Sequence, residues 1–353
     1  MTLVLVIIFI SILILVHEWG HFYAARRLGV KVEEFGFGFP PRIFSRIING
    51  VRYSLNLVPL GGFVKIFGEH GEGEGETASF VSRPALQRFI ILAAGVAMNI
   101  VLAWVLFSTA SAIGLPRLES DESTAPVSIL AVLPGSPAEQ AGLKLADEVL
   151  ELRSAEVSLR IETEQDIREF VDAYRGEEIT LLIRRQGKIE QLNATPRVQA
   201  PPGEGPLGVA LGRLAIERTP LYLAPIEGAR TVFTSTVAII SGLWSVIYQL
   251  ITTGGAPIAV SGPVGIFLFA QDSRVLGIAY FLQFIGILSV NLAILNFLPI
   301  PALDGGRVLF LLIEKVKGSR VNPRLEHTAH ALGFALLILL ILLVTYQDIT
   351  RVL

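Results

Sequence analysis

Three residues near the start of the chain have the types and the spacing for hydrolytic chemistry. His17, Glu18 and His21 form the pattern H-E-x-x-H. On a helix, the two histidines lie one turn apart on the same face. Two imidazoles placed in this way can bind one Zn²⁺, and the adjacent carboxylate can take a proton from water. The pattern therefore predicts a zinc site with Glu18 as the general base. A polar packing cluster or a helix end is the alternative interpretation.

The surroundings of this motif are apolar. Residues 3–16 contain one polar side chain, Ser11, and the whole chain of 353 residues is 52% hydrophobic and 17% charged. This composition is typical of membrane proteins, in which ionisable groups at depth are costly and are candidates for function. The net charge of −2 gives no indication of a nucleic-acid partner. Because the chain has no cysteine, a metal must be bound by histidines and carboxylates.

A catalytic zinc usually has three protein ligands and one open position, so the two histidines require a further ligand. Asp304 is the candidate, because it follows a helix that is interrupted by Pro299 and Pro301. Asn296 lies just before this interruption. We expect its amide to bind the substrate backbone or a developing oxyanion, and capping of the helix end is the alternative role.

Four apolar segments are long enough to cross a bilayer. They cover about residues 3–25, 89–113, 277–300 and 331–346. Arginines and lysines follow the first and the third of them, which indicates a cytoplasmic location for those ends. His17 and Asp304 are then both expected toward the cytoplasmic side.

Residues 231–251 are also uncharged and long enough to span. If they crossed the membrane, the next span would run in the opposite direction and would carry Asp304 away from His17. We therefore predict an amphipathic segment that lies at the outer interface, within a linker and interfacial region covering 201–273.

A short β region is expected at about residues 32–68. Phe35–Pro41 is predicted to form a turn rich in glycine and proline, and Val51–Val58 and Pro59–Ile66 are predicted to be strands. Backbone of this kind is tolerated at membrane depth only when it is buried in protein or lines a wet cavity. Its edge at Gly61, Gly62 and Phe63 is a candidate to pair with an extended substrate peptide. The alternative is a peripheral hairpin without a substrate role.

Residues 120–200 have the composition of a water-soluble domain. Strand, short helix, strand, amphipathic helix and hairpin follow one another, and this order resembles a PDZ domain of the bacterial protease type. The segment Pro134–Leu143 resembles the peptide-carboxylate loop of such domains, whereas Ala146 and Ser154-Ala155 depart from their pattern. The expected fold class is thus a polytopic α-helical membrane protein with four transmembrane helices, a membrane-dipping β element and an inserted α+β PDZ domain. The domain either binds a peptide or acts only as a steric lid.

Together these motifs resemble the site-2 proteases, and most closely the bacterial regulator-of-sigma-E type of RIP zinc metalloprotease. The resemblance covers nearly the whole chain and is carried by four segments besides H-E-x-x-H: Gly36–Phe39, Pro59–Lys65, Ser261–Gly265 and Asn296–Gly306. It implies a membrane core in two halves, residues 1–114 and 274–353, on either side of the inserted domain.

The resemblance also implies a function. It matches the zinc ligands to His17, His21 and Asp304, the catalytic glutamate to Glu18, and a conserved asparagine to Asn296. It implies an intramembrane endopeptidase of the bacterial inner membrane whose substrates are pre-trimmed single-pass proteins, such as anti-sigma factors, or signal-peptide remnants. The PDZ domain would lie outside the cytoplasm and exclude untrimmed substrates by size.

Two features depart from the family pattern. Relatives often carry two PDZ domains, whereas this chain has room for one, and Val96 stands where a proline is common. Two other classes of function are the alternatives. The chain could be a catalytically silent membrane scaffold that tethers peptides through its PDZ domain, or a metal transporter that uses the intramembrane histidines and aspartate.

Overall fold

The structure of the chain is a computed structural model, which describes residues 2–69, 71–119, 125–185, 187–201, 203–253, 262, 265–267, 270 and 277–352. The chain divides into two compact units. We call Met1–Thr109, Tyr222–Gln271 and Leu282–Leu353 the helical unit, and Ala110–Leu221 with Asp272–Phe281 the sheet unit. Each is described by itself. Parts of the predicted interfacial region 201–273 and of the segment Ser261–Gly265 lie outside the described residues.

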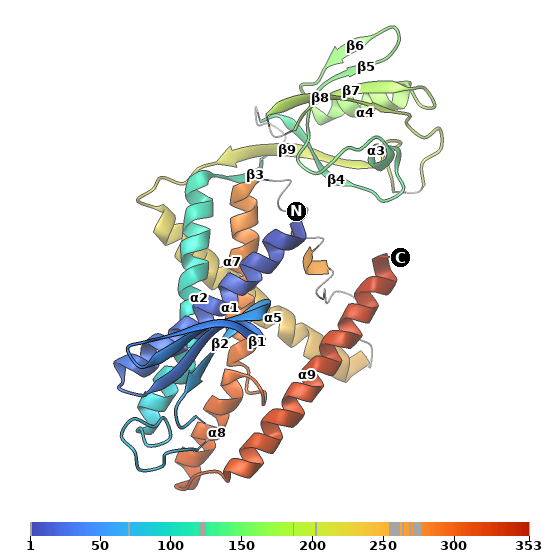
Figure 1. Ribbon diagram of the computed structural model, residues 1–353. Helices are drawn as coiled ribbons and strands as arrows, with labels where there is room; N and C mark the ends of the chain where they lie inside the picture. The colour runs from blue at the N-terminus through green and yellow to red at the C-terminus, as the bar shows by residue number, and fades with distance from the viewer. Residues whose placement is uncertain are drawn as a thin grey trace. The chain divides into compact units, whose positions relative to one another are not determined.

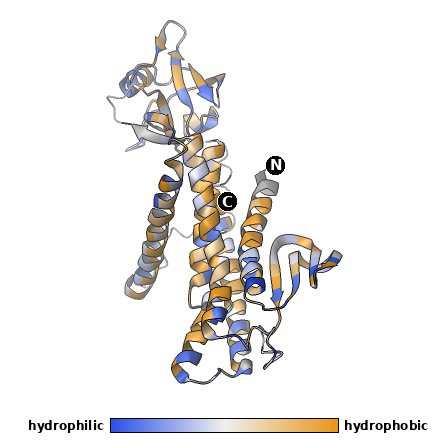
Figure 2. Cartoon of the chain, turned by 90° about the vertical axis from the view of Figure 1, so that its left-hand side faces the viewer, coloured by the Kyte–Doolittle hydropathy of each residue, from blue (hydrophilic) through white to orange (hydrophobic). Residues whose placement is uncertain are grey.

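The helical unit is built from long apolar helices (Figure 1). They are α1 Thr2–Arg27, α2 Ala85–Ile113, α5 Ala224–Thr253, α7 Ile278–Phe297 and α9 Pro323–Val352, with the shorter α8 Asp304–Lys317. In Figure 2 much of the ribbon of the long helices has the orange colour of hydrophobic residues. Such helices fit a polytopic membrane protein.

The number of candidate spans differs from the prediction. In the described part of the chain, five helices are long and apolar enough to cross a membrane, and the additional one covers Ala224–Gln249. Its polar threonines lower the hydropathy but do not interrupt a continuous helix, because Thr231 and Thr236 satisfy their hydroxyl groups on backbone carbonyls one turn earlier. The helix α8, which begins at Asp304, is a further element that the sequence analysis did not predict.

Contacts between the helices fix their relative directions. Along α1, His17 lies against Asn99 and His21 against Ile91, so α1 and α2 are antiparallel. Gly286 of α7 lies against Phe107, and Ser289 donates to the carbonyl oxygen of Asn99, so α2 and α7 are antiparallel too. Consequently α1 and α7 run in the same direction, as predicted from the requirement that Asp304 reach His17.

The helix α5 begins beside the later part of α2, where the indole of Trp104 donates to the carbonyl oxygen of Pro225. Figure 1 shows α5 and α7 both running from that end of the helical unit toward the end where α8 lies. The two helices are therefore not a simple pair of consecutive antiparallel spans. This arrangement keeps α7, and Asp304 after it, in the orientation that the sequence analysis required.

Two strands form a hairpin beside α1. They are β1 Val32–Ile48 and β2 Val51–Ile66, joined by a tight turn in which Asn49 and Gly50 have positive φ angles of 50° and 80°. The predicted turn at Phe35–Pro41 is wrong, because those residues belong to β1. Within this hairpin, Phe35 of β1 pairs with two residues of β2, Tyr53 and Val64, so this part of β1 lies between two parts of β2. The residues Gly62–Ile66 therefore form one edge of the sheet.

A buried cluster ties the hairpin to the helices that carry the site. It is formed by Ala24, Ala25, Val30, Val32, Val51, Ile66, Phe80, Ile91, Leu92 and Val308. These residues come from α1, β1, β2, α2, α8 and the loops before β1 and α2. The cluster holds the start of α8, and hence Asp304, in a fixed position relative to the H-E-x-x-H turn of α1.

The sheet unit has a path of six strands in the order β3-β9-β4-β5-β7-β8, with β6 paired to β5. The elements are β3 Leu115–Glu119, β4 Val127–Val132, α3 Pro137–Gln140, β5 Glu148–Arg153, β6 Ser158–Arg160, α4 Glu164–Ala173, β7 Ile179–Arg185, β8 Lys188–Ala194 and β9 Val209–Glu217. The predicted strands and helices between 127 and 194 all occur. The strand β9 lies in the predicted linker and is a correction: its alanines and glycine weaken the alternating pattern, yet it pairs with both β3 and β4.

Candidate metal centre

The first two candidate ligands come from consecutive turns of α1. The Nε2 atoms of His17 and His21 lie 3.2 Å apart, and both side chains are buried. Gly20 permits this turn to approach α2, because a Cβ there would lie 2.4 Å from the carbonyl oxygen of Ala94. The H-E-x-x-H turn therefore packs its histidine face directly against the backbone of α2.

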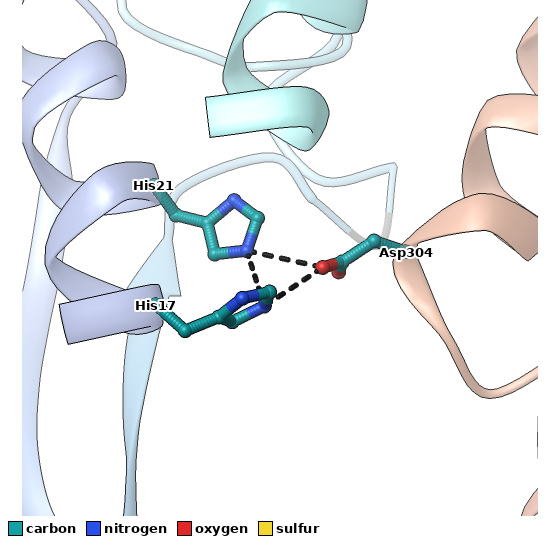
Figure 3. Close-up of side chains that lie close together, drawn as sticks. All are labelled: His17, His21 and Asp304. Carbon is teal, nitrogen blue, oxygen red and sulfur yellow. Dashed lines mark hydrogen bonds and ion pairs between the residues drawn. The ribbon is translucent and has the colours of Figure 1, made fainter. Parts of the chain in front are cut away.

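The third candidate ligand comes from the first residue of α8. Asp304 Oδ2 lies 2.9 Å from His17 Nε2 and 3.2 Å from His21 Nε2 (Figure 3). The next two residues explain this approach, since a Cβ at Gly305 would lie 2.2 Å from the carbonyl oxygen of Leu298, and one at Gly306 would lie 2.4 Å from that of Ile300. Only glycines allow the start of α8 to fold back tightly on the loop before it.

Neighbouring groups orient both imidazoles. His21 Nδ1 lies 2.8 Å from the carbonyl oxygen of Ile91, which can only accept, so Nδ1 carries the proton and Nε2 is left for a metal. His17 Nδ1 lies 3.3 Å from the side-chain amide of Asn99, whose oxygen is buried without a hydrogen-bond partner among the described residues. A half-turn of this amide lets its oxygen accept from Nδ1 and leaves Nε2 of His17 free as well.

The space between the two histidines and α2 depends on Gly95. A Cβ at this position would lie 2.3 Å from His21 Nε2 and 2.8 Å from His17 Nε2. Any side chain there would occupy the volume in which the two nitrogens converge. The sequence analysis did not identify Gly95 as part of the site, because a glycine in an apolar helix is a common feature of close helix packing.

The chemistry of Asp304 suits a ligand. An ionised carboxylate offers only acceptor oxygens, and Oδ2 of Asp304 faces the Nε2 atoms of both imidazoles.

The three donor atoms fit a zinc ion. Bonds of about 2.0–2.1 Å in a tetrahedral site place adjacent ligand atoms about 3.3 Å apart. The observed separations of 2.9 to 3.2 Å are close to this value. Two neutral imidazoles and one carboxylate are ligands that zinc commonly takes at catalytic sites, where a fourth position stays open. The group His17, His21 and Asp304 is the cluster of potential metal ligands found in the described part of the chain.

Glu18 points to a different neighbour. Its Oε2 accepts a hydrogen bond of 3.0 Å from the backbone N–H of Val64, on the edge of the hairpin. A Cβ on Gly62 would lie 3.8 Å from Glu18 Cγ. The carboxylate thus lies between the histidine turn and the strand edge that the sequence analysis predicted to receive a peptide.

The other predicted site residues lie in different surroundings. Asn296 Nδ2 lies 3.3 Å from His17 Nε2, so this amide does lie at the cluster. Gly61 and Gly62 are buried on the edge strand, Gly61 with a positive φ of 94°. The ring of Phe63 instead packs across the hairpin on Gly36, where a Cβ would be 2.4 Å from it. The structure therefore brings Asn296 to the candidate centre and Gly62 beside Glu18, whereas Gly61 lies against Ile14 and the Phe63 side chain packs against β1.

Comparison with known proteins identifies the family of the chain. A family model described as Peptidase family M50 matches residues 5–340. The chain belongs to this family. It is 33% identical to the "Putative zinc metalloprotease FN1322" of Fusobacterium nucleatum over 353 residues, which cover 99% of each chain. It is 28% identical to the zinc metalloprotease RasP of Oceanobacillus iheyensis over 436 aligned positions, again with 99% of each chain covered. The expected resemblance to site-2 proteases is confirmed at the level of the family.

The structure also describes the segment Pro134–Leu143, which resembles the peptide-carboxylate loop of PDZ domains. Two of its backbone N–H groups donate within the chain: Gly135 to the Glu139 carboxylate, and Glu139 to the Ser136 hydroxyl. Ser136 is the N-cap of α3, with Pro137 at the first helical position. The segment is therefore a capped helix start whose N–H groups at Gly135 and Glu139 donate within the chain.

Proposed function

We propose that the chain is a zinc-dependent intramembrane endopeptidase, with His17, His21 and Asp304 as the zinc ligands and Glu18 as the catalytic base. The observation that carries the proposal is the convergence of three ligand atoms, from residues 287 positions apart, at 2.9 to 3.2 Å within apolar helices. Membership of peptidase family M50 and relatives named zinc metalloproteases support the same reading.

The chemistry divides between the metal and the chain. A zinc ion supplies Lewis acidity, which makes water nucleophilic at neutral pH and polarises a carbonyl group. Glu18 takes the proton from the attacking water and delivers it to the leaving amine. Asn296, whose amide lies 3.3 Å from His17 Nε2, donates a hydrogen bond to the scissile carbonyl oxygen as negative charge develops there.

The hairpin edge supplies the substrate track. A peptide bond within a transmembrane helix is shielded by helical hydrogen bonds, so cleavage needs an extended substrate. We propose that residues Gly61–Ile66 pair with the unwound segment by strand addition. Val64 on this edge already contacts Glu18, so a peptide aligned there lies beside the base. This geometry favours the substrate role of the hairpin over that of a peripheral element.

The substrates that fit such a site are single-pass membrane proteins already trimmed outside the membrane, including anti-sigma factors and signal-peptide remnants, cleaved in regulated intramembrane proteolysis. We place the enzyme in the bacterial inner membrane with its active site toward the cytoplasm. The sheet unit, whose strand and helix order supports a PDZ-type domain, would lie on the outer side and restrict access by size or bind a peptide.

The substitution Glu18→Gln tests the catalytic role. It should abolish cleavage of a model transmembrane substrate, while elemental analysis still finds one zinc per chain, because Glu18 is not a ligand. Glu156→Gln is a matched control, since Glu156 is an exposed residue of the sheet unit. Cleavage by Glu18→Gln at the parent rate would contradict the mechanism. Peptide binding by a protein that retains no zinc would favour the silent scaffold instead.

A further inference from the structure

The loop that delivers Asp304 is held from a helix outside the candidate centre. It covers Leu298–Leu303, between α7 and α8, and it is contacted by the early part of α9. Two histidines lie in the first turns of α9. His327 is exposed, whereas His330 contacts this loop.

The first contact is a hydrogen bond between the loop backbone and an imidazole. The N–H of Ala302 donates to His330 Nδ1 at 2.8 Å. Ala302 has a positive φ of 86°, which a residue with a Cβ adopts only when its surroundings hold it there. Asp304 follows two residues later, so a shift of the Ala302 peptide group would also move the Asp304 carboxylate.

The second contact lies three residues later on the same face of α9. A Cβ at Gly333 would lie 2.2 Å from the carbonyl oxygen of Pro301, so the helix backbone touches the loop at this point. The ring of Phe310, on α8, lies 5.6 Å from the His330 ring and restricts its orientation. The imidazole is thus fixed between the helix that begins with Asp304 and the loop before it.

We infer that His330 is a positioning residue for the metal centre: with the close approach at Gly333, its imidazole fixes the Ala302 peptide and thereby places the Asp304 carboxylate against His17 and His21. His330 is not itself among the clustered potential ligands. The role depends on Nδ1 acting as an acceptor, and it requires no change of protonation. The inference rests on the proposed function for its effect on zinc, but the hydrogen bond to Ala302 can be tested without it.

Substitution of His330 by asparagine or by glutamine distinguishes a hydrogen-bonding role from a role in which the side chain only fills space. An asparagine oxygen takes about the place of Nδ1, whereas the amide of glutamine reaches the place of Nε2. We therefore expect His330→Asn to keep zinc affinity near that of the parent. His330→Ala and His330→Gln should weaken it by about 10- to 100-fold, as for other groups that orient metal ligands. His327→Ala, one turn earlier and exposed, is the control and should leave zinc affinity unchanged.

Two measurements on the full-length protein in nanodiscs decide the matter. Zinc dissociation constants come from competition with a chromophoric chelator, and hydrogen exchange of the 298–303 peptide is followed in metal-free protein. In His330→Ala the Ala302 amide should lose protection even without zinc. Parent-like zinc affinity and exchange in His330→Ala, or equal behaviour of the asparagine and glutamine variants, would overturn the inference.

A second variant guards against loss of folding. If His330→Ala does not accumulate, Gly333→Ala inserts a Cβ against Pro301 and should raise exchange of the same loop and weaken zinc binding. If Gly333→Ala leaves both unchanged, the inference is wrong. A parent protein that binds no zinc but protects the Ala302 amide through His330 would refute the proposed function, while the hydrogen bond between Ala302 and His330 would still stand.

Discussion

The two units of the chain differ in how many large apolar side chains they leave exposed. In the sheet unit, Leu152, Ile179 and Ile183 are fully buried in an apolar core. In the helical unit, the buried positions between helices include His17, His21, Asn99 and Ser289, while many large apolar side chains of α5 and α9 are exposed. The sheet unit is stabilised by removing apolar surface from water. The helical unit has the arrangement of a protein surrounded by lipid, with small residues at helix contacts and polar groups inside.

The largest contrast should come from adding one methyl group in each unit. Gly95→Ala places a Cβ between His17 and His21, so we expect loss of bound zinc and a fall in cleavage of about 100-fold or more. Gly205→Ala in the sheet unit meets open space and should change neither quantity. Zinc content by elemental analysis and cleavage of a model substrate measure both variants. Full zinc occupancy in Gly95→Ala would show that the site lies elsewhere.

The second contrast concerns the removal of apolar side chains. Leu152→Ala leaves a cavity in the core of the sheet unit and should destabilise that unit by about 2–5 kcal/mol. Leu339→Ala, on the exposed side of α9, removes a side chain that stays outside the protein interior and should change stability by less than about 0.5 kcal/mol. Pulse proteolysis of the full chain across a urea series gives both values. Equal effects would contradict the assignment of α9 to a lipid-facing position.

The smallest effect concerns a helix end. Thr163 and Asp166 form a capping box at α4, so Thr163→Ala should destabilise the sheet unit by about 1 kcal/mol, while Thr163→Ser should not.

Hydrogen bonds from the backbone N–H groups of Glu162 and Thr163 lower the pKa of Asp166. Its contribution is therefore complete above the unfolded pKa of about 3.9 and is lost as the pH falls through the lower folded value. Urea unfolding of the sheet unit between pH 3 and pH 6 checks the sign, and a contribution that grows on acidification would contradict it.

The sequence predicted the chemistry of the helical unit better than its architecture. The spacing of His17 and His21 and the helix break before Asp304 are local signals, and the structure brings these residues together. The directions of α1 and α7 followed from the same requirement. The extent of β1 was mispredicted, because Phe35–Pro41 contains turn-forming residues that tertiary pairing holds in a strand.

Other features have no local signal at all. Gly95 and His330 act through residues far away in the sequence, so their roles depend on distances that appear only when α2 and α9 pack on the site. In the sheet unit, the elements between 127 and 194 other than β6 were predicted from alternation and turn residues. The strand β9 was not, because Pro206 and two glycines around its start are also typical of a linker.

X-ray absorption at the zinc edge of the purified full-length protein tests the central claim most directly. We predict one zinc per chain, bound by two imidazole nitrogens and carboxylate or water oxygens, and a loss of one imidazole from the shell in His21→Ala. A protein that holds no zinc after gentle extraction from the membrane, or a zinc shell that is unchanged in His21→Ala, would contradict the account.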